Sequence, residues 1–255
     1  MKRIVFRWLK LVILVYCLAG IVVYYAQDKI LFKPKVVSHA YNFGKEVNIP
    51  FSANSTINIV QFPVNPSKGV VLYFHGNKEN IERYAPAAPQ FNKRGYEVWM
   101  IDYPGFGKST GEFTEQRLYD WAMVFYRLAR AKYGADSIIL YGKSLGTGIA
   151  AQLATRVNSK ALILEGPYYS IPSIFASWAP IYPWENMIKF KIPTGEYLKQ
   201  VSVPVTIFHG TSDYTIPYWN AKKLSCNDFV TIEGGAHNNL STFPLYQQKL
   251  DSLLR

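Results

Sequence analysis

Three residues of this 255-residue chain are of the types that together activate a hydroxyl group for nucleophilic attack. Ser144 lies in a Gly-x-Ser-x-Gly pattern, and Asp213 and then His237 follow it along the chain. A serine hydroxyl is a weak nucleophile until a base takes its proton, and the base must itself be oriented by an anion. We therefore predict that His237 deprotonates Ser144 and that Asp213 holds the imidazole.

The residues around Ser144 predict a tight turn from a strand into a helix. Apolar residues 138–141 precede the pattern, and the small-residue segment 149–154 follows it. Gly142 and Gly146 supply the small neighbours that such a turn requires. The turn would lift the Ser144 hydroxyl above the sheet and present the backbone N–H of the next residue at the start of a helix.

An acyl-transfer site also needs donors for the oxyanion of the tetrahedral intermediate. We expect the backbone N–H groups of Leu145 and Asn77 to fill this role. Asn77 ends the segment Phe-His-Gly-Asn, which directly follows an apolar strand predicted over residues 70–74. His75 in this segment and His209 in a second Phe-His-Gly segment are expected to be structural.

Asp213 and His237 each follow an apolar strand, and His237 lies in a glycine-rich loop, Glu-Gly-Gly-Ala-His-Asn-Asn. Taken singly, an aspartate after a strand is usually a turn or cap residue, and a histidine in a glycine loop is usually hydrogen-bonded there. The serine turn makes the catalytic interpretation of both residues the favoured one. Glu165, at the end of a strand predicted over 161–164, is the alternative for the acid.

Strands alternate with helices along most of the chain, which predicts a mainly parallel sheet with helices on both faces. An antiparallel pair at 46–49 and 57–62 leads the sheet. The further predicted strands are 70–74, 98–101, 137–141, 161–164, 205–208 and 229–232, and the predicted helices reach to about 94 and cover 114–132, 149–154 and 240–254.

Residues 167–204 interrupt this alternation and are rich in proline and aromatic residues. They follow the end of a central strand, where parallel sheets open their ligand crevice. We predict a short lid or acyl-binding wall here, with Tyr168, Trp178 and Trp184 contacting substrate. The alternative is an ordinary connection whose aromatic side chains pack on the core.

Residues 1–35 are predicted to form a unit separate from the domain at 36–255. Basic residues at the start precede an apolar run over 8–26, close to the roughly 20 residues that span a bilayer. We expect an uncleaved single-pass anchor; a cleaved signal peptide is the alternative. The basic residues weakly favour a cytoplasmic N-terminus with the domain on the other face, and the short connection over 27–34 would hold the domain against the bilayer.

Composition is in accord with one membrane-associated domain. The chain is 49% hydrophobic and carries a formal net charge of +11. This charge suits an anionic membrane or nucleic acid, but no basic run interleaved with aromatic residues indicates nucleic-acid binding. A solvated basic surface without a partner is the alternative. Cys17 and Cys226 do not indicate a disulfide, and nothing indicates an oligomeric state.

These segments together resemble the α/β-hydrolases, and specifically the membrane-anchored serine hydrolases with a short lid, among them aminopeptidase-like and lysophospholipase-like members. The segments that carry the resemblance are 71–77, 102–109, 141–146, 209–213 and 235–238, and 27–34 is similar to the segment that follows the anchor in these proteins. The resemblance implies a Ser/His/Asp triad without a metal or organic cofactor. It also implies hydrolysis of carboxylic esters, thioesters or, less often, amides.

The sequence thus favours a membrane-anchored serine hydrolase that cleaves esters or thioesters of acyl, lipid-like substrates through an acyl-enzyme. Ser144 at the turn, where epoxide hydrolases and dehalogenases carry aspartate, argues against those two chemistries. An aminopeptidase-like amide hydrolase and a non-catalytic binding module on the same scaffold are the alternatives.

Overall fold

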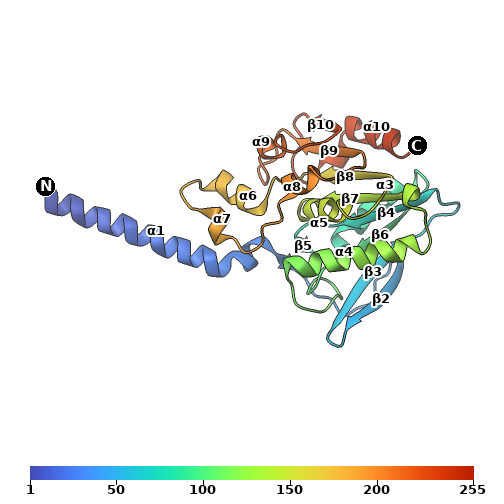
Figure 1. Ribbon diagram of the computed structural model, residues 1–255, viewed down its shortest axis with the longest axis horizontal. Coiled ribbons are helices and arrows are strands. Elements are labelled where there is room, and N and C mark those ends of the chain that lie inside the picture. The colour runs from blue at the N-terminus through green and yellow to red at the C-terminus, as the bar shows by residue number, and fades with distance from the viewer.

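The computed structural model describes residues 1–255 and is built around one eight-stranded sheet (Figure 1). The strand order is β10-β9-β8-β7-β4-β6-β3-β2. The strands are β2 (Lys45–Ser52), β3 (Ser55–Phe62), β4 (Gly69–Phe74), β6 (Tyr96–Ile101), β7 (Ile138–Lys143), β8 (Ala161–Glu165), β9 (Val205–Gly210) and β10 (Asp228–Ile232). Only β3 runs antiparallel to its neighbours, β2 and β6; the other pairs are parallel, which confirms the predicted fold class.

Helices cover both faces of the sheet because its central strands are apolar on both sides. In β4, Val70, Leu72 and Phe74 pack into one apolar layer, and Val71 and Tyr73 pack into the other. The first layer contains α4 (Glu115–Arg130), α5 (Leu145–Ala154) and α8 (Thr194–Leu198), and the second contains α2 (Ile81–Tyr84), α3 (Ala88–Asn92) and α10 (Pro244–Leu253). Figure 1 shows α4 and α5 together on one face.

Two predicted helices are shorter than the sequence indicated, and proline is the reason in both. The helix expected to end near residue 94 is divided into α2, a 3₁₀ turn and α3, because Pro86 and Pro89 cannot donate the backbone bonds of a continuous helix. The last helix begins at Pro244 after a 3₁₀ turn at Leu240–Thr242, as suits proline in the first helical turn.

The segment predicted as a lid contains three short helices between β8 and β9. These are α6 (Ile171–Trp178), α7 (Trp184–Met187) and α8. Because α8 packs on α5, the C-terminal part of the segment belongs to the core. Figure 1 shows α6 and α7 projecting from the body on the side of the N-terminal helix. The role of this segment as a lid stays a prediction.

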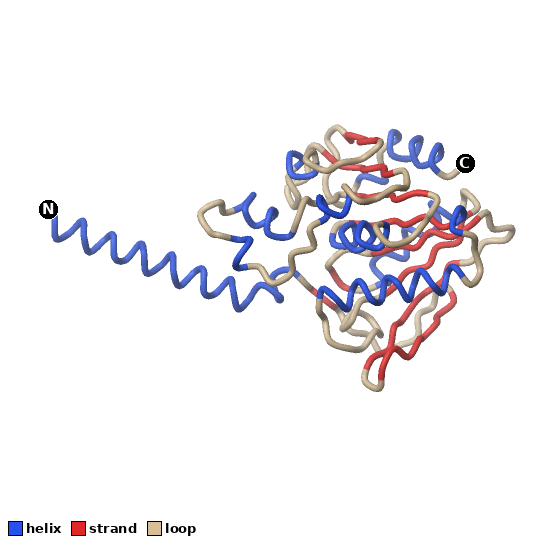
Figure 2. The backbone as a smooth tube through the Cα atoms, in the orientation of Figure 1, coloured by secondary structure: helices blue, strands red, loops and turns tan.

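The N-terminal helix α1 (Lys2–Leu31) extends well beyond the rest of the molecule (Figure 2). It is 30 residues long, and most of its side chains are exposed. Its most apolar 18-residue window has a mean hydropathy of 2.2, so the helix is long and apolar enough to cross a membrane; a signal sequence has the same features. After α1, the short strand β1 (Lys33–Pro34) pairs in parallel with β5 (Lys78–Glu79).

Candidate active site

Ser144 lies at a strained turn between β7 and α5. Its backbone has φ 51 and ψ −118, a conformation that a non-glycine residue rarely adopts. A Cβ atom on Gly142 would collide with the backbone of α5, and one on Gly146 would collide with the carbonyl group of Phe74. The two glycines therefore allow the turn to pass close to its neighbours, as the sequence predicted.

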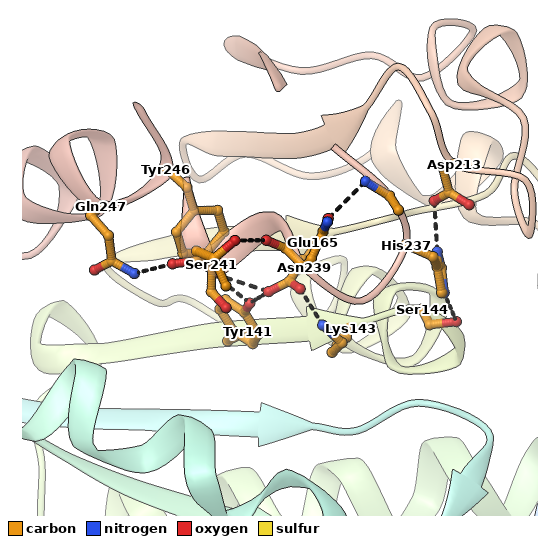
Figure 3. Close-up of polar contacts among 12 residues, drawn as sticks. Tyr141, Lys143, Ser144, Glu165, Asp213, His237, Asn239, Ser241, Tyr246 and Gln247 are labelled. Atoms are coloured by element: carbon orange, nitrogen blue, oxygen red, sulfur yellow. Dashed lines mark hydrogen bonds and ion pairs between the residues drawn. The ribbon is translucent and has the colours of Figure 1, made fainter. Parts of the chain in front are cut away.

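Asp213, His237 and Ser144 come from three strand ends and form a chain of hydrogen bonds (Figure 3). The Nε2 atom of His237 lies 2.9 Å from Ser144 Oγ, and its Nδ1 atom lies 2.6 Å from Asp213 Oδ2. Asp213 follows β9 and His237 follows β10, so parallel strands deliver both to the carboxyl edge of the sheet. The three side chains identified from the sequence are thus in contact.

Asp213 is held as a buried acceptor. Its Oδ1 atom accepts hydrogen bonds from the backbone N–H groups of Thr215 and Ile216, both at 2.9 Å. Burial alone would raise the pKa of Asp213, but the hydrogen bond and charge of His237 and the Ile216 N–H outweigh it, and the pKa is lowered. Asp213 is therefore an anion at neutral pH, as an orienting acid must be. Burial also lowers the pKa of His209, which bonds the Ile216 carbonyl at 3.0 Å and not His237.

Glu165, the alternative acid, points away from His237 (Figure 3). Its carboxylate accepts hydrogen bonds from Lys143, Tyr141 and Tyr246, the last at 3.0 Å. Burial alone would raise the pKa of Glu165, but the Lys143 charge and these hydrogen bonds lower it. The backbone carbonyl of Glu165 accepts the Ser144 N–H at 2.9 Å, so Glu165 supports the serine turn and makes no hydrogen bond to the imidazole.

The two predicted oxyanion donors line the same cavity as Ser144. Neither the Leu145 nor the Asn77 backbone N–H donates a hydrogen bond within the protein. The sequence did not predict how Asn77 is held. Its side-chain amide donates to the Leu31 carbonyl at 2.6 Å, and its own carbonyl accepts from the Lys33 N–H at 3.0 Å. The segment that follows α1 is therefore bonded to the loop that carries Asn77.

A small apolar pocket of about 90 Å³ adjoins Ser144. Tyr168 and Trp178, whose contact with substrate stays a prediction, line it. Three residues around the end of α1, Ile30, Leu31 and Phe32, line it as well. The position of Trp184 gives no support to its predicted contact with substrate, which stays a prediction. Its buried indole packs on Phe175 and Tyr182 and donates to the Ala179 carbonyl, so it stabilises α6 and α7 against each other and does not line the pocket.

A wider, polar cavity of about 310 Å³ forms the mouth of the site and includes Ser144 and His237. Its charged lining residues are Lys33, Lys78, Arg83 and Lys143, with no aspartate or glutamate among them. The structure contains no group of three or more His, Cys, Asp or Glu side chains arranged to hold a metal ion.

A family model described as serine aminopeptidase, S33, matches residues 65–194, half of the chain. The chain belongs to this family. The match covers the strand before Asn77, the serine turn and most of the predicted lid. The fold and the family together make the chain an α/β-hydrolase.

Curated relatives of this S33 family member include two human proteins. Protein ABHD12B is 32% identical over 175 residues, which are 61% of this chain and 48% of that protein. Alpha/beta hydrolase domain-containing protein 17B is 28% identical over 193 residues, 72% of this chain and 65% of that protein. The chain thus spans about half to just under two thirds of these relatives' length.

Solved structures with the same fold include an esterase and a lipase. The Pyrococcus furiosus esterase Pf2001 has a TM-score of 0.69 at 18% identity and covers 87% of this chain and 98% of its own. A monoacylglycerol lipase of Paleococcus ferrophilus has a TM-score of 0.57 at 15% identity and covers 78% of this chain and 98% of its own. At these identities the likeness concerns the fold alone.

Proposed function

We propose that this α/β-hydrolase is a membrane-anchored serine hydrolase that cleaves carboxylic ester or thioester bonds of acyl, lipid-like substrates. The observation that carries the proposal is the position of the His237 ring, which bonds Ser144 through Nε2 and Asp213 through Nδ1. A nucleophile within reach of a base, and a base held by an anion, is the arrangement that activates a serine.

The reaction would proceed in two steps. His237 Nε2 takes the Ser144 proton as Oγ attacks the acyl carbonyl, and Asp213 stabilises the imidazolium that forms. The N–H groups of Leu145 and Asn77 bind the oxyanion. The intermediate collapses to an acyl-enzyme as His237 returns the proton to the departing alcohol or thiol, and water, deprotonated by His237, then releases the acid.

The charge of the cavity mouth favours an ester or thioester over a peptide N-terminus. An aminopeptidase must bind the ammonium group of its substrate, for which a carboxylate is the usual partner. No acidic side chain lines the mouth, and two of its cations, Lys33 and Lys78, make no ion pair. Arg83 and Lys143 also line it but are paired with Glu79 and Glu165. This arrangement disfavours the aminopeptidase-like alternative, because like charges repel.

The non-catalytic alternative does not explain the backbone strain at Ser144. A positive φ at a serine costs on the order of 1–3 kcal/mol and persists only where the surrounding structure enforces it. In a binding module, the two free N–H groups beside that serine would serve no purpose either. We therefore favour the enzyme.

The experiment is covalent labelling of the full chain in detergent with a fluorophosphonate probe. Wild type should label, and Ser144→Ala should not; a folded wild type that fails to label would favour the binding module. The substrate class is then examined with esters, thioesters and amides of increasing acyl length. A strict preference for acetyl groups would contradict a lipid-like substrate, and faster cleavage of amides would restore the aminopeptidase-like alternative.

A further inference from the structure

The loop between α6 and α7 is hydrogen-bonded to the side of α1. We call residues 178–184 the lid tip; it joins α6 to α7 and contains no charged residue. The rings of Tyr16 in α1 and Tyr182 in the lid tip stack with centroids 4.4 Å apart. The Tyr16 hydroxyl donates to the Ile181 carbonyl at 2.9 Å, and the Tyr182 hydroxyl donates to the Tyr16 carbonyl at 2.8 Å.

Close packing at Gly20 extends this contact. Gly20 is buried, and a Cβ atom there would lie 3.0 Å from Cε1 of Tyr182. A larger residue would therefore push the tyrosine ring away from α1. The helix thus presents a glycine where the lid tip crosses it.

A second attachment lies further along α1, at Gln27, which is completely buried. Its Nε2 atom donates to the Met187 carbonyl at 3.2 Å, and its Oε1 atom accepts the Lys189 N–H at 2.7 Å. The Lys189 ammonium also lies 3.5 Å from Asp28. Two attachments separated along the helix fix the orientation of α6 and α7 relative to α1.

The distance between the attachments determines where a bilayer would lie. From Gln27 to Tyr16 the helix rises about 16 Å. A bilayer that holds the apolar run over residues 8–26 therefore surrounds Tyr16, and the lid tip with it. At the second attachment, near Gln27, the charged residues are Asp28 and Lys189. Asp28 lies just beyond the apolar run of α1, and Lys189 lies beside it.

The chemistry of the lid tip suits hydrocarbon. Trp178 and Ile181 are large apolar side chains that are 53% and 67% exposed. Irregular backbone is costly in a bilayer unless its polar groups are paired. Side chains supply partners for two carbonyl groups of the tip: Tyr16 for Ile181, and Trp184 for Ala179.

We propose that α1 and the lid tip enter the bilayer as one unit, so that the apolar pocket beside Ser144 takes its acyl chain directly from the lipid. Both parts of the unit line that pocket: Ile30 and Leu31 from α1, and Trp178 from the lid tip. In this arrangement the exposed side chains of the lid tip contact the hydrocarbon of a lipid bilayer. The route of the acyl chain rests on the proposed hydrolysis, whereas the depth of the tip rests only on the proposed anchoring by α1.

Depth is measured on the full chain in phosphatidylcholine vesicles, in a background with Cys17→Ala and Cys226→Ala. An environment-sensitive fluorophore is attached at Ile181→Cys or, as control, at Leu245→Cys, an exposed apolar position on α10 (48% exposed). Quenching by lipids with a nitroxide in the acyl chain is expected for the label at 181 and not for the label at 245. No quenching at 181, or equal quenching at both, would overturn the proposal.

The route is tested with Ile181→Lys and the matched control Leu245→Lys. A charge in the bilayer is costly, most of all at its centre and less near the surface. The ratio of kcat/KM for a long-chain ester in vesicles to that for a soluble butyrate ester should fall about tenfold in Ile181→Lys and should not change in Leu245→Lys. Equal ratios would overturn the lipid route. If wild type cleaves neither ester, the proposed function fails, while the fluorophore still decides the depth.

Discussion

The imidazole of His237 lies directly against the backbone of Gly166, the residue that follows β8. Gly166 has a φ of +61, and a Cβ atom built on it would lie 3.1 Å from Cε1 of His237 and 3.2 Å from Nδ1. A methyl group there would displace the ring by a few tenths of an ångström and lengthen its bonds to Ser144 and Asp213. We expect Gly166→Ala to lower kcat at least tenfold, because catalysis is sensitive to small displacements of the base.

The matched control is Gly105→Ala. Gly105 has a φ of +75, so alanine there carries a similar backbone strain of about 1–2 kcal/mol. Its Cβ atom would meet nothing within 4 Å. Both variants should lose stability on denaturant unfolding, and only Gly166→Ala should lose activity against a soluble ester. Equal kcat values would mean that the ring does not depend on Gly166.

Replacing the two candidate acids separately tests the assignment of Asp213. Asp213→Asn keeps the size of the side chain but favours the wrong imidazole tautomer, and we expect kcat to fall by on the order of 10⁴-fold. Glu165→Gln removes the partner of Lys143 and should lower stability, with kcat reduced less than tenfold. Steady-state kinetics on a soluble ester and unfolding curves separate the two effects. A larger kcat loss in Glu165→Gln than in Asp213→Asn would reverse the assignment.

The strands and the three contacting residues could be predicted because each leaves a local signal. A strand covered on both faces is a continuous apolar run, and Ser144, Asp213 and His237 each lie within a few residues of the end of such a run. Parallel strands then deliver them to one edge of the sheet. The division of the helix before residue 94 also had a signal, Pro86 and Pro89, which the prediction did not use.

The features that could not be predicted depend on direction and on distant contacts. Trp184 was assigned to the substrate wall because the segment is aromatic, but composition does not specify the direction of an indole, and this one packs inward. The bond between Asn77 and the Leu31 carbonyl joins residues 46 positions apart, and nothing near either residue indicates it. The predicted boundary between 35 and 36 stays a prediction, although residues 31–35 are bonded to the Asn77 loop.

The ion pair between Lys143 and Glu165 leads to a pH-dependent stability. The Glu165 side chain is buried, and removing the cation leaves an uncompensated charge, so Lys143→Met should lower the free energy of unfolding by about 3–5 kcal/mol at pH 7. In wild type the lowered pKa of Glu165 contributes stability that is present at neutral pH and is lost as the pH falls through the folded-state pKa, below an ordinary glutamate value of about 4.3.

In Lys143→Met, burial becomes the dominant effect and raises the pKa of Glu165. The folded state then binds the proton more tightly than the unfolded state, so the variant becomes less stable as the pH rises above about 4.3. In denaturant unfolding, the free energies of unfolding of wild type and Lys143→Met should therefore differ strongly at pH 7 and only slightly at pH 4. Lys199→Met, which breaks the exposed pair with Glu196, is the control and should leave the stability nearly unchanged at both pH values, because solvent screens exposed ion pairs. A pH-independent difference would contradict this account.

The bond between Asn77 and the end of α1 should matter for catalysis as well as for structure. Asn77→Ala keeps the backbone N–H proposed to bind the oxyanion but removes the side-chain bond to the Leu31 carbonyl. A hydrogen bond of this kind is worth about 0.5–1.5 kcal/mol, so we expect kcat to fall about two- to tenfold as the loop loosens. Asn92→Ala is the matched control, because the Asn92 amide bonds the carbonyls of Phe62 and Tyr96, outside the site. Asn92→Ala should lose stability and keep its kcat on a soluble ester. If Asn77→Ala also keeps its kcat, the bond to Leu31 does not position the oxyanion donor.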